Sequence, residues 1–252
     1  MQRTASIPNR SKLIAAALAL ASLAGAASAA PQIINLRSGQ VGGLPGVAGQ
    51  QDDIVTFLPN NPPGAAISAS PFTTTDFAGA ASGPSASVIN PVWAWTPGLT
   101  DPLARWINFD GFFTNPDGTP GVGWGAPGSC LYAVPFNISL SSITNATLSL
   151  EFAVDDYLGD HPFYGGGNQA GLYINGMSTG YDGGNFVSST FHFQNITSFV
   201  NPGLNYLYFY QRDIGVSVSG LIFSARITVI PTPGAAALLG VGGLLAFRRR
   251  RF

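Results

Sequence analysis

Alternation of large apolar residues with other residues is the feature that most constrains how this chain can fold. Every second residue from Leu148 to Val154 is a large apolar one, and Glu151 lies on the opposite side. A period of two is typical of a strand with one buried face, because successive side chains of a strand point to opposite sides. The same alternation recurs at residues 206–210 and 221–229. These three stretches predict the central strands of a β-sheet.

Shorter apolar stretches, separated by glycine, proline, asparagine and aspartate, predict further strands. They lie at residues 33–36, 54–58, 92–95, 105–109, 131–138, 171–174 and 186–193. Helical spacing of apolar residues is almost absent between the two ends of the chain. Many short strands with turn residues between them are typical of a β-sandwich or jelly roll. We therefore expect an all-β fold.

The predicted β-domain covers residues 30–230, a length that suits one sandwich. Residues 30–90 have the weakest pattern, and their Ser/Thr/Ala-rich stretch at 65–87 would suit a flexible linker. We keep them in the domain because residues 33–36 and 54–58 are apolar enough to add edge strands. Cys130 is the only cysteine, so it has no partner for an intramolecular disulfide, and we expect it to be buried.

The charge of the predicted domain argues against one class of partner. Between residues 30 and 230, four arginines and no lysine oppose twelve acidic residues, which gives a net charge of −8. Nucleic acid is bound by clustered lysine and arginine. We therefore expect no nucleic-acid partner.

The first 29 residues predict a secretory signal peptide. Basic residues precede an apolar run of about 11 residues, which ends in small residues at Ala27, Ser28 and Ala29. The run is too short to cross a hydrocarbon layer of roughly 30 Å. We expect signal peptidase to cut after Ala29 and the rest of the chain to be exported.

The last 22 residues predict a membrane segment. Pro231, Thr232 and Pro233 precede an apolar run up to Phe247, which is followed by Arg248, Arg249, Arg250 and Arg251. A helix from Ile230 to Phe247 would be about 27 Å long and would just span a bilayer. Basic flanks stay on the cytoplasmic side, so the arginines would lie inside and the β-domain outside.

This arrangement resembles the PEP-CTERM sorting signal of Gram-negative bacteria: a Pro-x-Pro motif, a short helix rich in small residues and a terminal arginine cluster. The resemblance implies processing near the motif by an exosortase, a membrane transpeptidase, and association with exopolysaccharide. Thr232 stands where the family usually has Glu. Two alternatives remain: a sortase signal of the Leu-Pro-x-Thr-Gly type, which Pro233 breaks at its fourth position, and a plain C-terminal membrane anchor.

Four stretches together resemble the galactose-binding-like jelly-roll modules of exported proteins. They are residues 104–107, 146–156, 171–176 and 199–207. In such modules a strand that ends in Asp is followed by a strand with an Asn-Gly turn, and a Gly-x-Asn corner opens a late strand. The resemblance implies the fold and speaks only weakly for a sugar ligand.

Tryptophans are the candidate ligand-binding residues, because aromatic rings stack on the apolar faces of sugars. Trp124 lies in a loop between two glycines and is the first choice, followed by Trp93 and Trp95. The alternative is that these rings fill the core.

Carboxylates crowd one predicted loop at Asp155, Asp156 and Asp160, with His161, Asn168 and Gln169 after them. Oxygen ligands of this kind suit a structural calcium ion, although aspartate is also common in turns. Glu151 with Asp155 or Asp156 would be the carboxylate pair of a glycoside hydrolase. We expect no enzyme, because Glu151 is predicted on the polar face of its strand and no histidine has a marked acid partner.

The function expected from these features is that of an exported protein of the cell surface or extracellular matrix. It would be membrane-anchored at its C-terminus, transiently or permanently, and would bind polysaccharide without catalysis. The alternatives are a structural or adhesive protein that binds other proteins and, third, a glycoside hydrolase.

Overall fold

The computed structural model describes residues 30–58, 71–109, 115–119, 129–160, 170–213 and 218–232. Contacts divide the chain into two units, and Gln32–Val229 form the larger one. The predicted signal peptide and nearly all of the C-terminal segment lie outside the described residues. Within those residues, no helix has the length and apolar character needed to cross a membrane.

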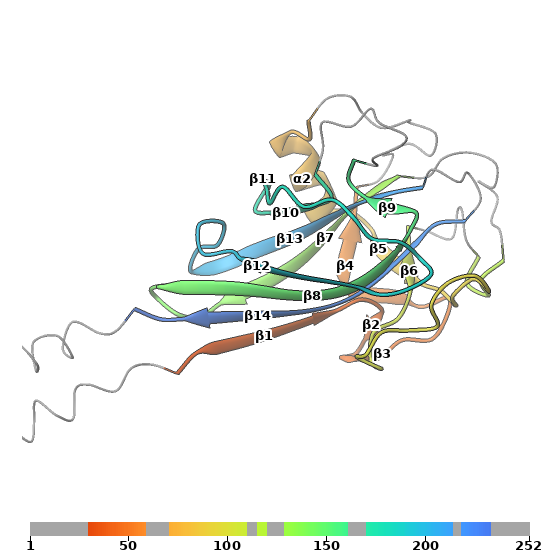
Figure 1. The fold of residues 1–252 in the computed structure, drawn as a ribbon, viewed down its shortest axis with the longest axis horizontal. Helices are drawn as coiled ribbons and strands as arrows, with labels where there is room; N and C mark the ends of the chain where they lie inside the picture. Colours follow the sequence, from red (N-terminus) through yellow and green to blue (C-terminus); the bar gives the residue numbers. More distant parts are fainter. Residues whose placement is uncertain are drawn as a thin grey trace, which may run out of the picture. The chain divides into compact units, whose positions relative to one another are not determined.

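The described elements are mostly strands (Figure 1). In chain order they are β1 (Gln32–Arg37), β2 (Gln40–Val41), β3 (Leu44–Pro45), β4 (Gln51–Phe57), α2 (Thr74–Ala81), β5 (Ser85–Val88), β6 (Ile107–Asn108), β7 (Cys130–Ile138), β8 (Asn145–Asp155), β9 (Tyr157–Leu158), β10 (Leu172–Ile174), β11 (Met177–Ser178), β12 (Thr190–Asn195), β13 (Gly203–Arg212) and β14 (Gly220–Ile230). The fold is therefore mostly β, as the sequence predicts.

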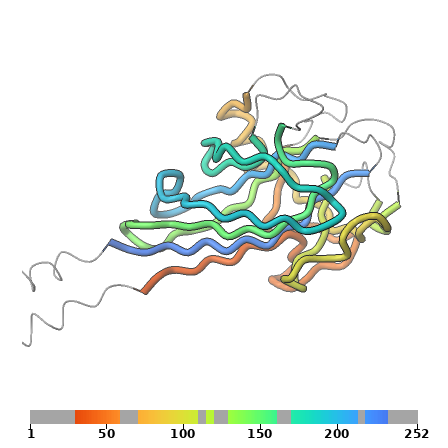
Figure 2. The backbone as a smooth tube through the Cα atoms, in the orientation of Figure 1, coloured from red at the N-terminus to blue at the C-terminus, as the bar shows by residue number. Residues whose placement is uncertain are grey.

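One curled antiparallel sheet holds every described strand except the β2–β3 hairpin. Its order is β11-β10-β13-β7-β4-β5-β6-β14-β8-β12, with β9 beside β13 and β1 beside β14. The longest described register joins β13 to β7, from Gly203 opposite Ile138 to Gln211 opposite Cys130. Figure 2 shows β1, β14 and β8 running side by side.

The main core lies where the two halves of the curled sheet face each other. β13 contributes Leu207 and Phe209, while β8 contributes Phe152 and β14 contributes Phe223. Phe209 and Phe223 stack with ring centroids 4.6 Å apart, which joins the two halves directly. Cys130 is fully buried in the same core, as expected, and burial raises the pKa of its thiol well above the usual value.

β8 follows the predicted alternation only in its first part. Leu148 and Leu150 are buried in the core, and Ser149 between them is exposed. Further along, Glu151 and Ala153 are buried as well, so the prediction of a half-buried strand was wrong there. The reason is a long loop that covers this part of the outer face.

The stretch at 65–87 forms more structure than a linker where the structure describes it. Residues 71–87 contain α2 and most of β5, and neither element was predicted. Thr73 caps α2: its hydroxyl accepts from the Asp76 N–H, and the Asp76 carboxylate accepts from the Thr73 N–H. This capping box was a readable signal. The helix is too short to show periodicity, since only Phe77 and Ala80 are buried.

Three of the short predicted strands were wrong in extent or kind. Residues 92–95 form a turn, in which the Trp95 N–H donates to the Val92 carbonyl. The strand predicted at 186–193 begins only at Thr190, because the Asn185 side chain accepts from the following backbone N–H groups and holds a turn. The strand predicted at 105–109 is limited to Ile107–Asn108.

Candidate binding surface around the 89–106 loop

The connection between β5 and β6, residues 89–106, contains no helix or strand and is here called the Trp loop. Connections in compact domains are mostly about 4–6 residues long, and long ones without secondary structure are often functional. The Trp loop packs on the outer faces of β8 and β14, where Trp95 and Trp106 meet Ala153 and Ile222.

The two buried tryptophans form the apolar foot of the Trp loop. Their ring centroids lie 4.3 Å apart, and the Trp106 Nε1–H donates to the Thr96 carbonyl at 3.0 Å. Gly220 at the start of β14 makes room for them, because a Cβ there would lie 2.6 Å from the Trp95 ring. Trp95 is therefore a core residue and not the ligand-binding residue that the sequence suggested.

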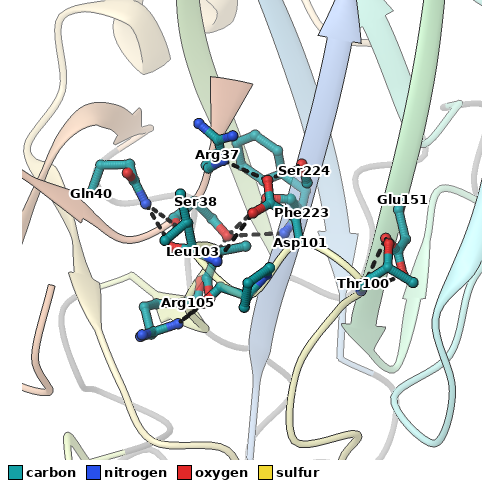
Figure 3. A network of polar contacts seen from close by, with 12 residues as sticks. Arg37, Ser38, Gln40, Thr100, Asp101, Leu103, Arg105, Glu151, Phe223 and Ser224 are labelled. Carbon is teal, nitrogen blue, oxygen red and sulfur yellow. Dashed lines mark hydrogen bonds and ion pairs between the residues drawn. The ribbon is translucent and has the colours of Figure 1, made fainter. Parts of the chain in front are cut away.

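Three acidic side chains hold the Trp loop to the sheet, and Figure 3 shows two of them, Glu151 and Asp101. Glu151 accepts from both the N–H and the hydroxyl of Thr100, with 3.0 Å between its Oε1 and the Thr100 N. Asp101 pairs with Arg37 at 2.5 Å and accepts from the Ser224 hydroxyl at 2.7 Å. The third anchor is Asp155.

Asp155 accepts from the Trp95 Nε1–H at 2.9 Å and is buried. Burial, followed by a hydrogen bond with Asp156 and the charges of Asp156 and Asp213, raises the pKa of Asp155 to about 10. Asp155 is therefore protonated at neutral pH.

Asp101 has the opposite electrostatics. Burial by itself would raise its pKa, but hydrogen bonds from Ser224 and Arg37 outweigh burial and lower the pKa below 3.8. The Trp loop is also fixed through its backbone, because the Arg105 N–H donates to the Ser38 carbonyl and the Ser38 hydroxyl donates to the Arg105 carbonyl. Charge, hydrogen bonds and packing thus hold the loop against the sheet.

A cleft of about 540 Å³ lies along the Trp loop. Its walls combine the loop prolines and Leu99 with the polar groups of Asn90, Asp101 and Arg105. Trp93, two positions after the cleft residue Pro91 in the chain, does not line the cleft and is 95% exposed. Of the three tryptophans proposed as ligand contacts, Trp93 is available to a ligand, Trp95 is buried, and Trp124 lies outside the described residues.

The predicted calcium ligands are held by different partners. Asp155 meets Trp95, and Asp160 pairs with Arg212 at 3.4 Å. The backbone N–H of Asp156 donates to the Arg212 carbonyl. No group of three His, Cys, Asp or Glu side chains suited to a metal ion occurs in the part of the chain that the structure describes. Asn168 and Gln169 lie outside that part, so the calcium site stays a prediction.

The carboxylates considered for glycoside hydrolysis act in the structure as loop anchors. Glu151 accepts a hydrogen bond from Thr100, and Asp155 accepts one from Trp95. Of the sorting motif, Pro231 and Thr232 follow the end of β14, while Pro233 and Arg248–Arg251 lie outside the described residues.

A second groove was missed by the sequence analysis. It has a volume of about 860 Å³ and lies between α2 and β13, where Phe72, Phe77, Tyr206 and Tyr208 line it. The Tyr206 and Tyr208 rings are stacked at an interplanar angle of 27°, with centroids 5.9 Å apart. Their alternation along the strand was visible in the sequence, but nothing local indicated that a helix would form the opposite wall.

No protein-family model matches the chain, and no curated protein sequence is significantly similar to it.

Proposed function

We propose that this protein is a non-catalytic carbohydrate-binding module exported to the cell surface or extracellular matrix, with Trp93 on the Trp loop as its main ligand contact. The observation that carries the proposal is the 95% exposure of Trp93 on a loop that three acidic side chains and a tryptophan pair hold in place. Tryptophan is highly buried on average, so full exposure needs a reason.

A sugar ligand suits this surface for two reasons. Aromatic rings stack on the apolar face of a pyranose, and the neighbouring cleft offers the Asn90 amide, the Asp101 carboxylate and the Arg105 guanidinium beside apolar walls. A preformed site loses little conformational entropy on binding, which favours affinity. The curled antiparallel sheet with two facing halves agrees with a jelly-roll module of the galactose-binding type, and that finer classification is part of the proposal.

Export and sorting are proposed from the two ends of the chain. Signal peptidase would cut after Ala29, and an exosortase-type transpeptidase would act near Pro231–Pro233 while Arg248–Arg251 hold the tail at the membrane. The mature domain would then carry a net charge of −8, which favours solubility in a hydrated matrix.

One experiment tests both parts. The full gene is expressed in a Gram-negative host with an exosortase, the surface-extracted protein is weighed by intact mass spectrometry, and it is then applied to a glycan array. We expect a chain that begins at Ala30 and ends near residue 233, and binding that falls at least about tenfold in Trp93→Ala. Leu204→Ala, which removes another exposed apolar side chain, is the control.

The outcomes separate the alternatives. A chain that still ends at Phe252 would make the tail a plain anchor. Glycan binding that survives Trp93→Ala would remove Trp93 from the site. A protein that binds no glycan but retains a surface protein through Trp93 would be the adhesive alternative, and glycan cleavage would make it a hydrolase.

A further inference from the structure

The edge strand β12 differs from the other edge of the same half-sheet. β12 pairs with β8 alone in the described residues and ends the sheet order. At the opposite edge, β1 is tied to the end of β7, where the Gln32 side chain donates to the Asn137 carbonyl and accepts from the Ser139 N–H. Among the described residues no strand lies beside the free edge of β12. Its inward side chains contact the preceding segment, where Gln194 donates to the Thr179 carbonyl at 3.1 Å and the His192 ring centroid lies 3.9 Å from that of Tyr181.

The backbone groups on the free edge can be identified from the register. The Ile196 N–H donates to the Ala146 carbonyl, so the hydrogen-bonded pairs with β8 continue at residues 194, 192 and 190. The N–H and C=O groups of Phe191, Phe193 and Asn195 therefore point away from β8. A row of donors and acceptors in this spacing is matched by another β-strand.

The side chains of the same strand are apolar and exposed. Phe191 is 69% and Phe193 is 70% exposed, and both lie on the outer face opposite Glu151 and Ser149 of β8. Exposed edges are usually protected by lysine, proline or a bulge. β12 has none of these, and its pairing with β8 is regular.

We propose that β12 pairs in antiparallel orientation with β12 of a second copy of this protein, with His192 at the two-fold axis. This register places Phe191 of each copy opposite Phe193 of the other, so both pairs exchange backbone hydrogen bonds and all four rings meet on one face. An isologous contact needs such self-complementarity.

Charge favours a second copy of this protein as the partner that pairs with β12. Residues 185–200 contain no Asp, Glu, Lys or Arg in a domain of net charge −8, so the copies meet where their mutual repulsion is least. The four partly exposed rings bring on the order of 500 Å² of apolar surface, which corresponds to a weak dimer and not an obligate one.

Sedimentation equilibrium of the mature protein from micromolar to near-millimolar concentration tests the proposal. We expect a monomer–dimer equilibrium that tightens with added salt, because screening weakens the repulsion between two negative domains. Phe193→Lys should raise the dissociation constant at least about tenfold. Leu204→Lys changes the charge equally at a 62%-exposed site on β13 and should leave the constant unchanged.

Hydrogen exchange distinguishes strand pairing from a side-chain contact. The amides of Phe191 and Phe193 should gain protection as protein concentration rises, while the amide of His192 should not change. A protein that stays monomeric at high salt overturns the proposal. A dimer that survives Phe193→Lys, or that leaves both amides unprotected, also overturns it. Loss of glycan binding in a monomeric Phe193→Lys variant overturns it as well, because that result would assign the edge of β12 to a ligand.

Discussion

The two outer faces of the curled sheet are covered in different ways. Over β7, β10 and β13, the cover is α2 with an aromatic layer made of Phe77, Tyr173 and Tyr208. Over β8 and β14, the cover is the Trp loop, whose hydrogen bonds reach residues more than 50 positions away, such as Glu151 and Asp155. A short helix satisfies its own backbone and is held mainly by apolar contact. A long loop lacks regular backbone hydrogen bonds and needs side-chain hydrogen bonds to hold it in place. The two covers should therefore respond differently to truncation and to pH.

Truncating Phe77, the α2 residue in the aromatic layer, should have the largest effect on stability. Phe77 lies 4.9 Å from the ring of Tyr208 and 5.2 Å from that of Tyr173, so Phe77→Ala should lower the free energy of unfolding by about 3–5 kcal/mol. Urea unfolding measures the loss, which should not vary with pH between 6 and 8. Phe191→Ala is the matched control at an exposed site, and in the monomer its loss should stay within about 0.5 kcal/mol. A loss at Phe77 no larger than the control would show that α2 is not held by packing.

On the face covered by the Trp loop, the contribution to stability should depend on pH through Asp155. Its pKa is about 10 in the folded protein against 3.8 when unfolded, so the folded state holds a proton that the unfolded chain has released. Stability must then fall as pH rises between these two values, by at most about 1.4 kcal/mol per pH unit. Asp155→Asn mimics the protonated form and should remove this slope, so the variant should gain up to about 3 kcal/mol on wild type from pH 6 to pH 8.

Thermal or urea unfolding at a series of pH values gives the comparison. The charges of Asp156 and Asp213 contribute to the slope because they help to raise the pKa of Asp155. Asp117→Asn is the control: the pKa of this exposed carboxyl is lowered by hydrogen bonds from Thr119, so it is charged in both states above pH 6. Parallel stability curves for wild type and Asp155→Asn would contradict the protonated anchor.

The smallest effect is expected at Glu151. Glu151→Gln leaves one acceptor oxygen for the N–H and hydroxyl of Thr100, and should lower the free energy of unfolding by about 1 kcal/mol. A double-mutant cycle with Thr100→Val isolates the pair. Additive losses would show that Glu151 and Thr100 do not anchor the loop together.

The strands in the middle of the chain were predictable because their signal is local. Leu148 to Val154, residues 206–210 and residues 221–229 show a period of two, and all three form long strands. α2 was missed because its eight residues bury only two side chains, which is too few to show a helical period. The turn at residues 92–95 was predicted as a strand because tryptophan is as apolar as typical strand residues. In the structure these tryptophans belong to the Trp loop.

The candidate site was predictable in residue type but not in place. The sequence singled out Trp93, Trp95, Glu151 and Asp155, and all four belong to the Trp loop or its anchors. Which tryptophan is exposed, and that the carboxylates accept from Thr100 and Trp95, depends on the close approach of segments about 50–60 residues apart. No local pattern records such a contact.

By itself, the sequence determined the strand-rich architecture, the acidic charge of the β-domain and the solitary cysteine, because each depends only on residue identity and near-neighbour spacing. Tertiary structure decided that β12 is an edge strand, that α2 forms one wall of the second groove, and which aspartate is charged. These depend on burial and on distances between residues remote in the chain. Asp155 and Asp101 show the reason. Burial beside other acids raises the pKa of Asp155 at the end of β8, whereas hydrogen bonds from Ser224 and Arg37 lower the pKa of Asp101 within the Trp loop.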